Sequence, residues 1–230
     1  MEAVMTEGKN ALIIGASRGL GYALATEFLR RGWQVTATER TPSALHELAG
    51  LTVETVDIAV PEQVAALRER LAGSAFDLLF VNAGTNYTTD PSATFADVST
   101  EDFAQVMVTN ALSPMRVVET LQDLVPATGT IGVMSSGQGS VADNTKGGFE
   151  VYRASKSALN QLMRSFAARH ADDPRTLLLL APGWVKTDLG GPGARLTVDE
   201  SIPGVADTIE AWTGKGGLHY LDRQGQTVNW

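Results

Sequence analysis

Tyr152 and Lys156 are the two side chains of this sequence best suited to acid–base chemistry. They stand four residues apart in a segment with helical character, YRASKSALNQLMRSFAARH. On a helix this spacing places both side chains on one face, about one turn apart. A lysine cation beside a phenol favours the phenolate, which lowers the tyrosine pKa from about 10 toward neutrality, as a proton-transfer group requires. The same spacing is common on exposed helix faces, so the rest of the chain decides its meaning.

Composition narrows the class of protein. The chain has 230 residues, a formal net charge of −8, no cysteine and three histidines. This length fits one domain over residues 1–230 with a large core. The acidic balance argues against nucleic acid or an anionic membrane surface as the main partner. Without cysteine there is no disulfide framework or thiol nucleophile, and the histidines lack ligand spacing, so we expect no metal site.

The sequence shows no membrane or export signal. Its longest apolar runs have the length of strands, far below the roughly 20 residues that cross a bilayer. The first residues, MEAVMTEGKN, are acidic and lack the apolar core of a signal peptide. We therefore expect a cytoplasmic protein with no membrane partner.

Short apolar runs alternate with longer amphipathic stretches along the whole chain. The pattern predicts strands at 10–14, 33–38, 51–56, 76–81, 130–135, 176–180 and 218–221. It predicts helices at 20–31, 42–49, 61–72, 100–125, 152–171 and 198–212. Near-continuous apolar strands that alternate with helices indicate a parallel sheet covered on both faces. The predicted fold class is α/β, a single-domain doubly wound parallel sheet of about seven strands with helices on both faces.

A glycine-rich loop directly follows the first predicted strand. Three glycines between a strand and a helix let the backbone approach a pyrophosphate, and the helix N-terminus presents free N–H groups and partial positive charge to it. A tight strand-to-helix turn is the alternative, but the position after the first strand of an alternating chain favours a dinucleotide. The predicted cofactor-binding residues of this loop are Gly15, Ser17, Arg18, Gly19, Leu20 and Gly21.

The GxxxGxG spacing of this loop, together with YxxxK, resembles the short-chain dehydrogenases/reductases over roughly residues 9–230. Other matches follow in the family's order: at or near the ends of predicted strands, Asp57-Ile58, Asn82-Ala83-Gly84, Ser135-Ser136 and Pro182-Gly183 with Thr187, and within the long predicted helix, Asn110. Alone, each of these has a structural explanation, such as capping a turn or entering a helix. The stretches YRASKSALN and PGWVKTDLGG look most like the C-factor/sniffer-like carbonyl reductase branch, although that branch usually has His where Ala181 stands.

The resemblance implies a Rossmann-type fold and an enzyme that interconverts a carbonyl and an alcohol with NAD(P)(H). In the family's pattern Tyr152 is the general acid/base, and Lys156 lowers its pKa and holds the nicotinamide ribose. Ser136 polarises the carbonyl, and Asn110 holds a water that links Lys156 to solvent. Beyond the glycine loop, the implied cofactor contacts are Asp57, Ile58, Asn82, Ala83, Gly84, Tyr152, Lys156, Pro182, Gly183, Val185 and Thr187.

The position of the serine is the weakest match. The family commonly has it nearer the tyrosine, where Gly139 and Ser140 stand. Ser136 is preferred because it directly follows the fifth strand, whose end the fold fixes. Ser135 is then the structural neighbour of Ser136, and Ser140 remains an alternative.

The end of the second strand bears on the choice of cofactor. A carboxylate at Glu39 can accept both ribose hydroxyls of NAD and repels a 2′-phosphate. Arg18 and Arg40 argue for NADP, because arginine is a bidentate partner of phosphate. Glu39 then points away or pairs with an arginine, although Arg40 has the alternative of a solvated loop charge. We favour NADP(H), with NAD(H) as the alternative.

The loops at 137–149 and 184–196 bear on the substrate, and two helices bear on the oligomeric state. The loops should flank the nicotinamide, with Phe149, Trp184 and Leu189 beside Ser136 and Tyr152 as substrate contacts; ordinary loop packing is the alternative. No large insertion follows the sixth strand, so we expect a small or medium carbonyl or alcohol. Helices 100–125 and 152–171 have apolar residues on more than one face, and in the family they pair as a homodimer or homotetramer interface. The alternative is that they pack wholly on the sheet.

A second class of function stays open. Some proteins of this architecture bind a dinucleotide as sensors or signalling proteins and do not turn over substrate. The presence of Tyr152, Lys156, a serine and Asn110 favours the enzyme.

Overall fold

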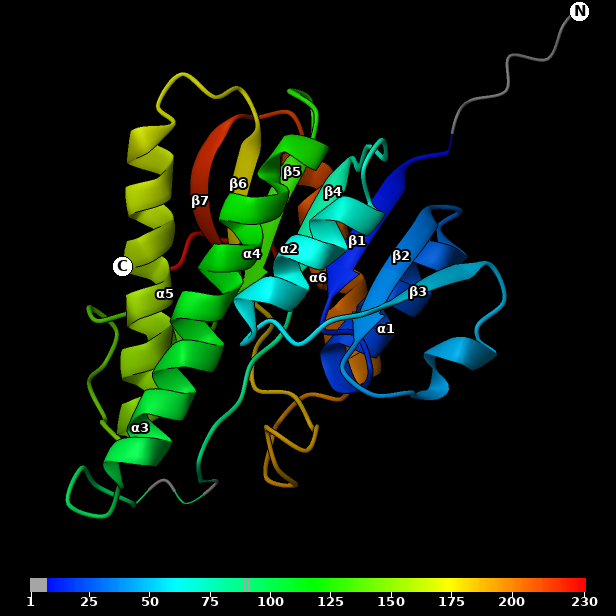
Figure 1. Cartoon of the computed structure of the whole chain (residues 1–230). Coiled ribbons are helices and arrows are strands. Elements are labelled where there is room, and N and C mark those ends of the chain that lie inside the picture. Colours follow the sequence, from blue (N-terminus) through cyan, green and yellow to red (C-terminus); the bar gives the residue numbers. More distant parts are fainter. Residues whose placement is uncertain (1–7, 89, 91) are drawn as a thin grey trace, which may run out of the picture.

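The computed structural model describes residues 8–88, 90 and 92–230. Its centre is a seven-stranded sheet of order β3-β2-β1-β4-β5-β6-β7, in which every neighbouring pair is parallel (Figure 1). The strands are β1 (Asn10–Ile14), β2 (Gln34–Glu39), β3 (Leu51–Thr55), β4 (Leu78–Val81), β5 (Thr130–Met134), β6 (Thr176–Ala181) and β7 (Gly217–Asp222). The predicted doubly wound α/β fold is confirmed.

Helices connect the strands. They are α1 (Gly19–Arg30), η1 (Ala44–Glu47), α2 (Pro61–Arg70), α3 (Thr100–Met107), η2 (Val108–Leu112), α4 (Ser113–Leu121), η3 (Gln122–Leu124), η4 (Gly137–Gly139), α5 (Glu150–Arg169) and α6 (Val198–Trp212). The short helix expected at 42–49 is a single 3₁₀ segment, η1.

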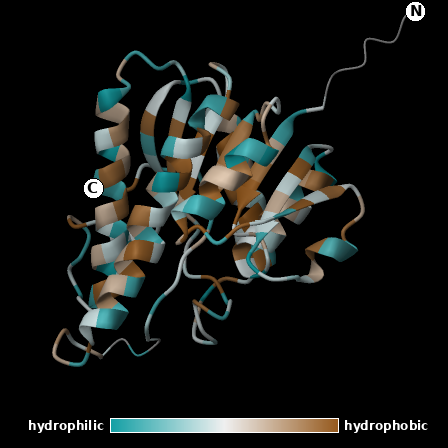
Figure 2. Cartoon of the chain, in the orientation of Figure 1, coloured by the Kyte–Doolittle hydropathy of each residue, from teal (hydrophilic) through white to brown (hydrophobic). Residues whose placement is uncertain are grey.

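Alternating side chains of the central strands build a core on each face of the sheet. In β1, Leu12 and Ile14 belong to the buried cluster that contains side chains of α2, α4 and α5. Ala11 and Ile13 belong to the cluster that contains side chains of α1 and α6. The hydropathy colouring of Figure 2 shows the apolar strands between these helical layers. Each fully buried Leu or Ile contributes roughly 1.5–3 kcal/mol, so both faces hold the strand ends in place.

The long helix expected at 100–125 is not uniform. Ser99 caps α3, its Oγ accepting a hydrogen bond from the Asp102 backbone N–H at 3.0 Å. The π-helix η2 then separates α3 from α4 and carries Asn110 with no exposed surface. A π-helical turn accommodates one residue more than an α-turn and is frequent at functional sites. The interruption therefore falls on the one residue of this segment that the sequence assigns to the site.

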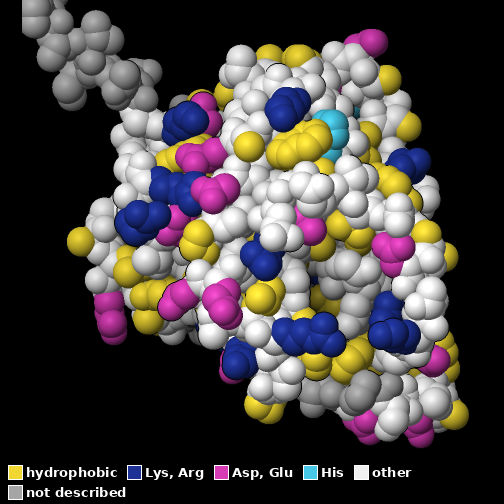
Figure 3. Space-filling model, turned by 180° about the vertical axis from the view of Figure 1, so that it is seen from behind, with side chains coloured by type: hydrophobic (Ala, Val, Ile, Leu, Met, Phe, Trp, Pro, Cys, Tyr) yellow, Lys and Arg dark blue, Asp and Glu magenta, His cyan; other side chains and the backbone are white. Residues whose placement is uncertain are grey.

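Ion pairs tie α1 to α6 on the face seen in Figure 3. Arg31 contacts Glu27 at 2.8 Å within α1 and reaches Asp207 at 2.8 Å and Glu210 at 2.5 Å in α6. Figure 3 shows basic and acidic side chains intermingled on this face. Among the residues that the structure describes, no helix has both the length and the apolar character needed to cross a membrane.

Candidate active site

The predicted site residues follow the carboxyl ends of parallel strands. Gly15 follows β1, Asn82 follows β4, Ser136 follows β5 and Pro182 follows β6. Because the strands are parallel, these ends meet at one edge of the sheet, which is where α/β proteins bind ligands.

Close packing explains the glycines of the first loop. A Cβ at Gly15, where φ is 82°, would lie 2.9 Å from the Ala83 Cβ, and one at Gly21 would lie 2.2 Å from the Gly15 carbonyl oxygen. Asn82 Nδ2 donates to that same carbonyl oxygen at 3.0 Å. The loop after β1 is thus fastened to the turn after β4, Asn82-Ala83-Gly84.

The start of α1 is built to receive an anion. Its N-cap, Arg18, makes no side-chain hydrogen bond to the helix, and the first turn contains no acidic residue. The first N–H groups of the helix therefore meet neither a side-chain cap nor a carboxylate, while the helix dipole places partial positive charge there. With the tight approach at Gly15 and Gly21, these groups fit the pyrophosphate of a dinucleotide. Ser17 and Leu20 flank this start, each half-buried.

Asp57 and Ile58 lie past the end of β3. The Asp57 side chain accepts a hydrogen bond from the Ala59 backbone N–H at 2.9 Å and is half-buried. Ile58 packs into the core cluster below it. The structure places both at the same edge of the sheet as the glycine loop.

The Glu39 carboxylate is bonded to side chains of the segment that follows β2. Its side chain is 1% exposed and accepts hydrogen bonds from Ser43 Oγ at 2.6 Å and from His46 Nε2 at 2.7 Å. Burial raises its pKa, but these hydrogen bonds and the His46 charge outweigh burial and lower it overall. The expectation that Glu39 is turned away is met, and its partners are Ser43 and His46 rather than an arginine.

The two arginines expected near the ribose differ in their surroundings. Arg18 pairs with Asp188 at 2.9 Å, and both side chains are about three-quarters exposed, at 74% and 77%. Exposed pairs of this kind contribute little, about 0–1 kcal/mol, so an anion can displace Asp188. Arg40 is exposed directly after Glu39.

Tyr152 sits in the first turn of α5, behind a strained start. Phe149, the residue before the helix, has φ 51°, and it is the one non-glycine residue of the described chain with positive φ. The Arg153 Nε donates to the Gly148 carbonyl oxygen at 2.8 Å and fastens this turn. Left-handed backbone at a bulky residue is costly and collects at functional sites.

Burial dominates the electrostatics of Tyr152. The packing around its phenol raises the pKa to about 12, while hydrogen bonding with the Ser136 side chain lowers it and the neighbouring Tyr220 raises it further. Lys156 is not among the groups that shift the pKa of Tyr152 in this structure, so its lowering of that pKa together with a bound nicotinamide stays a prediction. The contact that does work in that direction comes from Ser136.

Lys156 is buried, with 2% of its surface exposed. Its Nζ donates to the Met134 carbonyl oxygen at 2.9 Å and lies 5.7 Å from the centroid of the Tyr152 ring. Burial lowers the pKa of Lys156 to about 8. A Cβ at Gly84 would lie 3.5 Å from this Nζ, so the lysine faces the turn after β4.

The three candidate serines have distinct partners. Ser135 Oγ is buried and donates to Asn160 Oδ1 at 2.6 Å. Ser140 Oγ accepts from the Asp143 backbone N–H at 3.0 Å. Ser136 is half-buried, accepts from the Gln138 N–H at 3.1 Å and is the serine whose side chain lowers the pKa of Tyr152. Of the three, only Ser136 acts on the pKa of the Tyr152 phenol.

Asn110 is a clamp between two elements. Its Oδ1 accepts from the Thr85 N–H at 2.7 Å, and its Nδ2 donates to the Thr85 carbonyl oxygen at 2.8 Å and to Ser155 Oγ at 2.9 Å. Both N–H bonds are thus used. Oδ1 can accept two hydrogen bonds and so keeps one lone pair free for a water. It lies beside Gly84, as Lys156 Nζ does, because a Cβ there would be 3.5 Å from either atom.

The segment after β6 folds over the glycine loop. Pro182 accepts a hydrogen bond from Ser201 through its carbonyl oxygen at 2.7 Å, and Gly183 has φ 87°. Val185 bridges to Leu196, which closes the loop, and a Cβ at Gly19 would lie 3.7 Å from Thr187. Trp184 and Leu189 are 46% and 42% exposed.

One neighbour of the site carries no motif. Tyr220 in β7 is 1% exposed, and its hydroxyl donates to the Ser136 carbonyl oxygen. The sequence signal for this residue was an aromatic side chain in the last apolar strand, which predicts core packing and not a role near Ser136.

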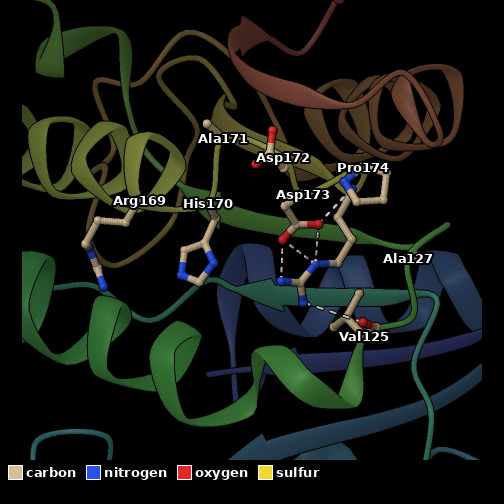
Figure 4. Close-up of a pocket in the computed structure, with 9 residues that line it drawn as sticks. Val125, Ala127, Arg169, His170, Ala171, Asp172, Asp173 and Pro174 are labelled. Atoms are coloured by element: carbon tan, nitrogen blue, oxygen red, sulfur yellow. Dashed lines mark hydrogen bonds and ion pairs between the residues drawn. The ribbon is translucent and has the colours of Figure 1, made fainter.

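A separate hollow lies at the opposite edge of the sheet. Figure 4 shows it between the segments that precede β5 and β6, with a volume of about 520 Å³. Its half-buried charge, Arg175, pairs with Asp173 and also donates to the Val125 carbonyl oxygen. It contains none of the predicted site residues.

Known proteins resemble this chain along most of its length. A putative short-chain dehydrogenase/reductase of Burkholderia multivorans with bound NADP is 58% identical, with a TM-score of 0.94 over 97% of this chain and 100% of that one. The 1-hydroxy-2-glutathionyl-2-methyl-3-butene dehydrogenase of Rhodococcus sp. (strain AD45) is 30% identical over 95% of this chain and 98% of its own.

Two further relatives confirm the resemblance to the C-factor/sniffer-like branch. The C-signal protein of Myxococcus xanthus is 35% identical over 67% of this chain and 92% of its own. The carbonyl reductase Sniffer of D. melanogaster is 26% identical, with a TM-score of 0.88 over 97% of this chain and 100% of that one. The family model described as short chain dehydrogenase matches residues 9–194. The chain therefore belongs to the short-chain dehydrogenase family, whose members are oxidoreductases.

Proposed function

We propose that this protein is an NADP(H)-dependent oxidoreductase that interconverts a carbonyl and an alcohol on a small or medium organic substrate. The observation that carries the proposal is the meeting of Tyr152 and Ser136 at the edge of the sheet where the glycine loop and the Asn82 turn also end. A proton donor, a hydroxyl donor and a dinucleotide cradle then share one site.

When bound, the nicotinamide supplies or accepts the hydride. In the direction of reduction the hydride goes to the carbonyl carbon, and Tyr152 gives its proton to the oxygen, which yields the alcohol. Ser136 Oγ donates a hydrogen bond to that oxygen and stabilises the charge that develops on it. With a pKa raised to about 12, Tyr152 carries its proton at neutral pH and so holds a proton that it can give to this oxygen.

Lys156 is proposed to hold the nicotinamide ribose hydroxyls. Its ammonium has three N–H groups, of which one donates to Met134, so two remain for a ligand. Its position beside Gly84 places these groups at the turn after β4. The relay through Asn110 is retained as a proposal, but only through its Oδ1. We propose the other residues predicted for the cofactor, from Gly15 to Thr187, in the roles given above.

Three features support NADP over NAD. Glu39 is buried and bonded to Ser43 and His46, so no free carboxylate remains to repel a 2′-phosphate. Arg40 is exposed beside it, and Arg18 is held only by an exposed pair. Arginine suits phosphate through paired hydrogen bonds. The Burkholderia multivorans relative with bound NADP points the same way.

We also propose a homodimer. Phe103 in α3, Leu112 in η2 and Leu162 in α5 are exposed by 37%, 40% and 39%. Figure 1 shows α3 and α5 side by side on one flank of the molecule. Covering such side chains stabilises a symmetric pair. Light scattering should give twice the mass of the chain; the mass of one chain would contradict the dimer, and four times that mass would indicate the tetramer.

A substrate panel tests the function. The purified protein is mixed with NADPH or NADH and with ketones and aldehydes of small and medium size, and the nicotinamide absorbance is followed. We expect NADPH to be consumed with at least one carbonyl compound, and the corresponding alcohol to reduce NADP⁺. Tight NADPH binding without turnover across the panel would instead support the dinucleotide-sensing alternative.

A further inference from the structure

The last strand places a second tyrosine behind the serine of the site. Tyr220 pairs with Leu179 in the register of β7 on β6, so the sheet fixes its backbone. Its phenol is buried among the core side chains, and its hydroxyl donates a hydrogen bond to the Ser136 carbonyl oxygen. Burial raises the pKa of Tyr220, against hydrogen bonding with Asn160 and Ser135, so it stays a donor at neutral pH.

This hydrogen bond acts on a residue that lies just outside regular structure. Ser136 follows the end of β5 and precedes η4, so the ladder of the sheet no longer holds it. Its neighbour Ser135 is fixed to α5 through Asn160. A held carbonyl at Ser136 restricts the backbone from which Oγ extends and so sets the direction of Oγ toward Tyr152. Misplacing a catalytic hydroxyl by about 1 Å costs up to roughly 100-fold in rate.

The chain beyond Tyr220 returns to the same loop. The Val228 N–H donates to the Tyr220 carbonyl oxygen at 2.9 Å, and the Trp230 ring lies 5.5 Å from the Tyr220 ring, centroid to centroid. The Ala142 N–H then donates to the Trp230 carbonyl oxygen at 3.0 Å. Asn229 adds a bond from Nδ2 to Asp143 Oδ1 at 2.9 Å.

We propose that Tyr220 is a positioning residue for the reaction, and that the tail at 227–230 supports it by holding the loop that follows Ser136. In this role Tyr220 acts by holding the Ser136 carbonyl oxygen and does not touch the substrate. This proposal rests on the proposed function, in which Ser136 Oγ donates a hydrogen bond to the substrate oxygen.

Tyr220→Phe tests the positioning role, because it removes only the hydroxyl group. We expect kcat for the best carbonyl of the panel to fall about tenfold, as for one lost hydrogen bond, with NADPH affinity unchanged within about twofold. In a Ser136→Ala background the same change should cost less than about twofold. Tyr22→Phe is the matched control, a half-buried tyrosine on α1, and should retain wild-type kcat. The proposal would be overturned if Tyr220→Phe lowered kcat by the same factor in the Ser136→Ala background as in wild type. It would also be overturned if Tyr220→Phe left kcat unchanged.

Hydrogen exchange gives a readout that does not need turnover. We expect Tyr220→Phe to speed amide exchange at 136–143 and Asn229→Ala to speed it at 141–144, with exchange in β1 and β4 unchanged. No change in the loop in either variant would overturn the proposal even if kcat falls. If Tyr152→Phe keeps full turnover, the proposed function fails instead, and the exchange data still decide whether Tyr220 and the tail hold this loop.

Discussion

Lys156 Nζ lies 5.7 Å from the centroid of the Tyr152 ring and donates its hydrogen bond to the Met134 carbonyl oxygen. The two side chains are therefore close, but burial is the main cause of the pKa shift of each. Burial disfavours charge on each, raising the pKa of Tyr152 to about 12 and lowering that of Lys156 to about 8. With a pKa raised to about 12, Tyr152 is protonated at neutral pH, which is the form that a proton donor needs.

The pH dependence should separate the two directions. Reduction needs protonated Tyr152, the form present below its pKa, so kcat/KM for a carbonyl should stay flat within about threefold from about pH 6 to pH 7.5, below the Lys156 pKa of about 8 at which the ammonium loses its charge. Oxidation needs the deprotonated form, so its rate should rise with pH over the same range. Steady-state rates in both directions check this. A reduction rate that falls tenfold or more over that range would mean that the phenolate is stabilised in the working enzyme.

The three serines should differ on replacement by alanine. Ser136→Ala removes the donor beside Tyr152 and should lower kcat by about 100-fold or more. Ser135→Ala removes the donor to the buried Asn160 Oδ1 and should mainly lower stability, by about 1–3 kcal/mol. Ser140→Ala should change kcat less than about threefold. Turnover and urea denaturation measure the two effects. A larger loss of kcat in Ser140→Ala than in Ser136→Ala would reassign the role.

Cofactor preference should respond to Arg40 and not to Glu39. Arg40→Ala should raise the Kd for NADPH about tenfold and leave that for NADH within about twofold, because only NADPH carries the 2′-phosphate. Glu39→Gln should change the ratio of the two Kd values less than about threefold, because the side chain is turned to Ser43 and His46. Titration by nicotinamide fluorescence measures both. An unchanged NADPH affinity in Arg40→Ala would contradict this account.

Glu27 should make stability depend on acid. Hydrogen bonding to Arg30, against the effect of burial, and then contact with Arg31 lower its pKa to about 2. A carboxyl whose pKa is lower in the folded chain stabilises the fold above its unfolded pKa of about 4.5, and the gain disappears as the pH falls toward 2.

Glu27→Gln should therefore cost about 1–2 kcal/mol at pH 7, and the difference from wild type should shrink below about pH 4.5. Urea denaturation across this pH range checks it. Glu69→Gln, on an exposed surface of α2, is the control and should track wild type. A Glu27→Gln difference that is constant with pH would contradict the assignment.

The elements that carry the cofactor loop could be predicted from sequence because they are local. Buried parallel strands read as apolar runs, and the glycines after β1 mark close packing that no other residue allows. The interruption at Asn110 was not predicted, because a π-turn adds one residue without disturbing the apolar pattern of the helix on either side.

Features that depend on contacts between distant parts of the chain could not be predicted from the sequence. The i, i+4 spacing of Tyr152 and Lys156 suggested mutual tuning, but their pKa values depend on how deeply the sheet and α5 bury them. Tyr220 lies 84 residues from Ser136, and no motif links them. Ser136 could be predicted because it follows the end of β5, and the position of a strand end is fixed by the sheet.

Replacement of Tyr152 by phenylalanine tests the central claim most directly. The change removes one hydroxyl and keeps the ring, so NADPH binding by fluorescence titration should stay within about threefold of wild type. Turnover of the best carbonyl substrate should fall by about 1,000-fold or more, because the proton donor is gone. A Tyr152→Phe variant that binds NADPH normally and reduces the carbonyl at a rate near wild type would contradict the account.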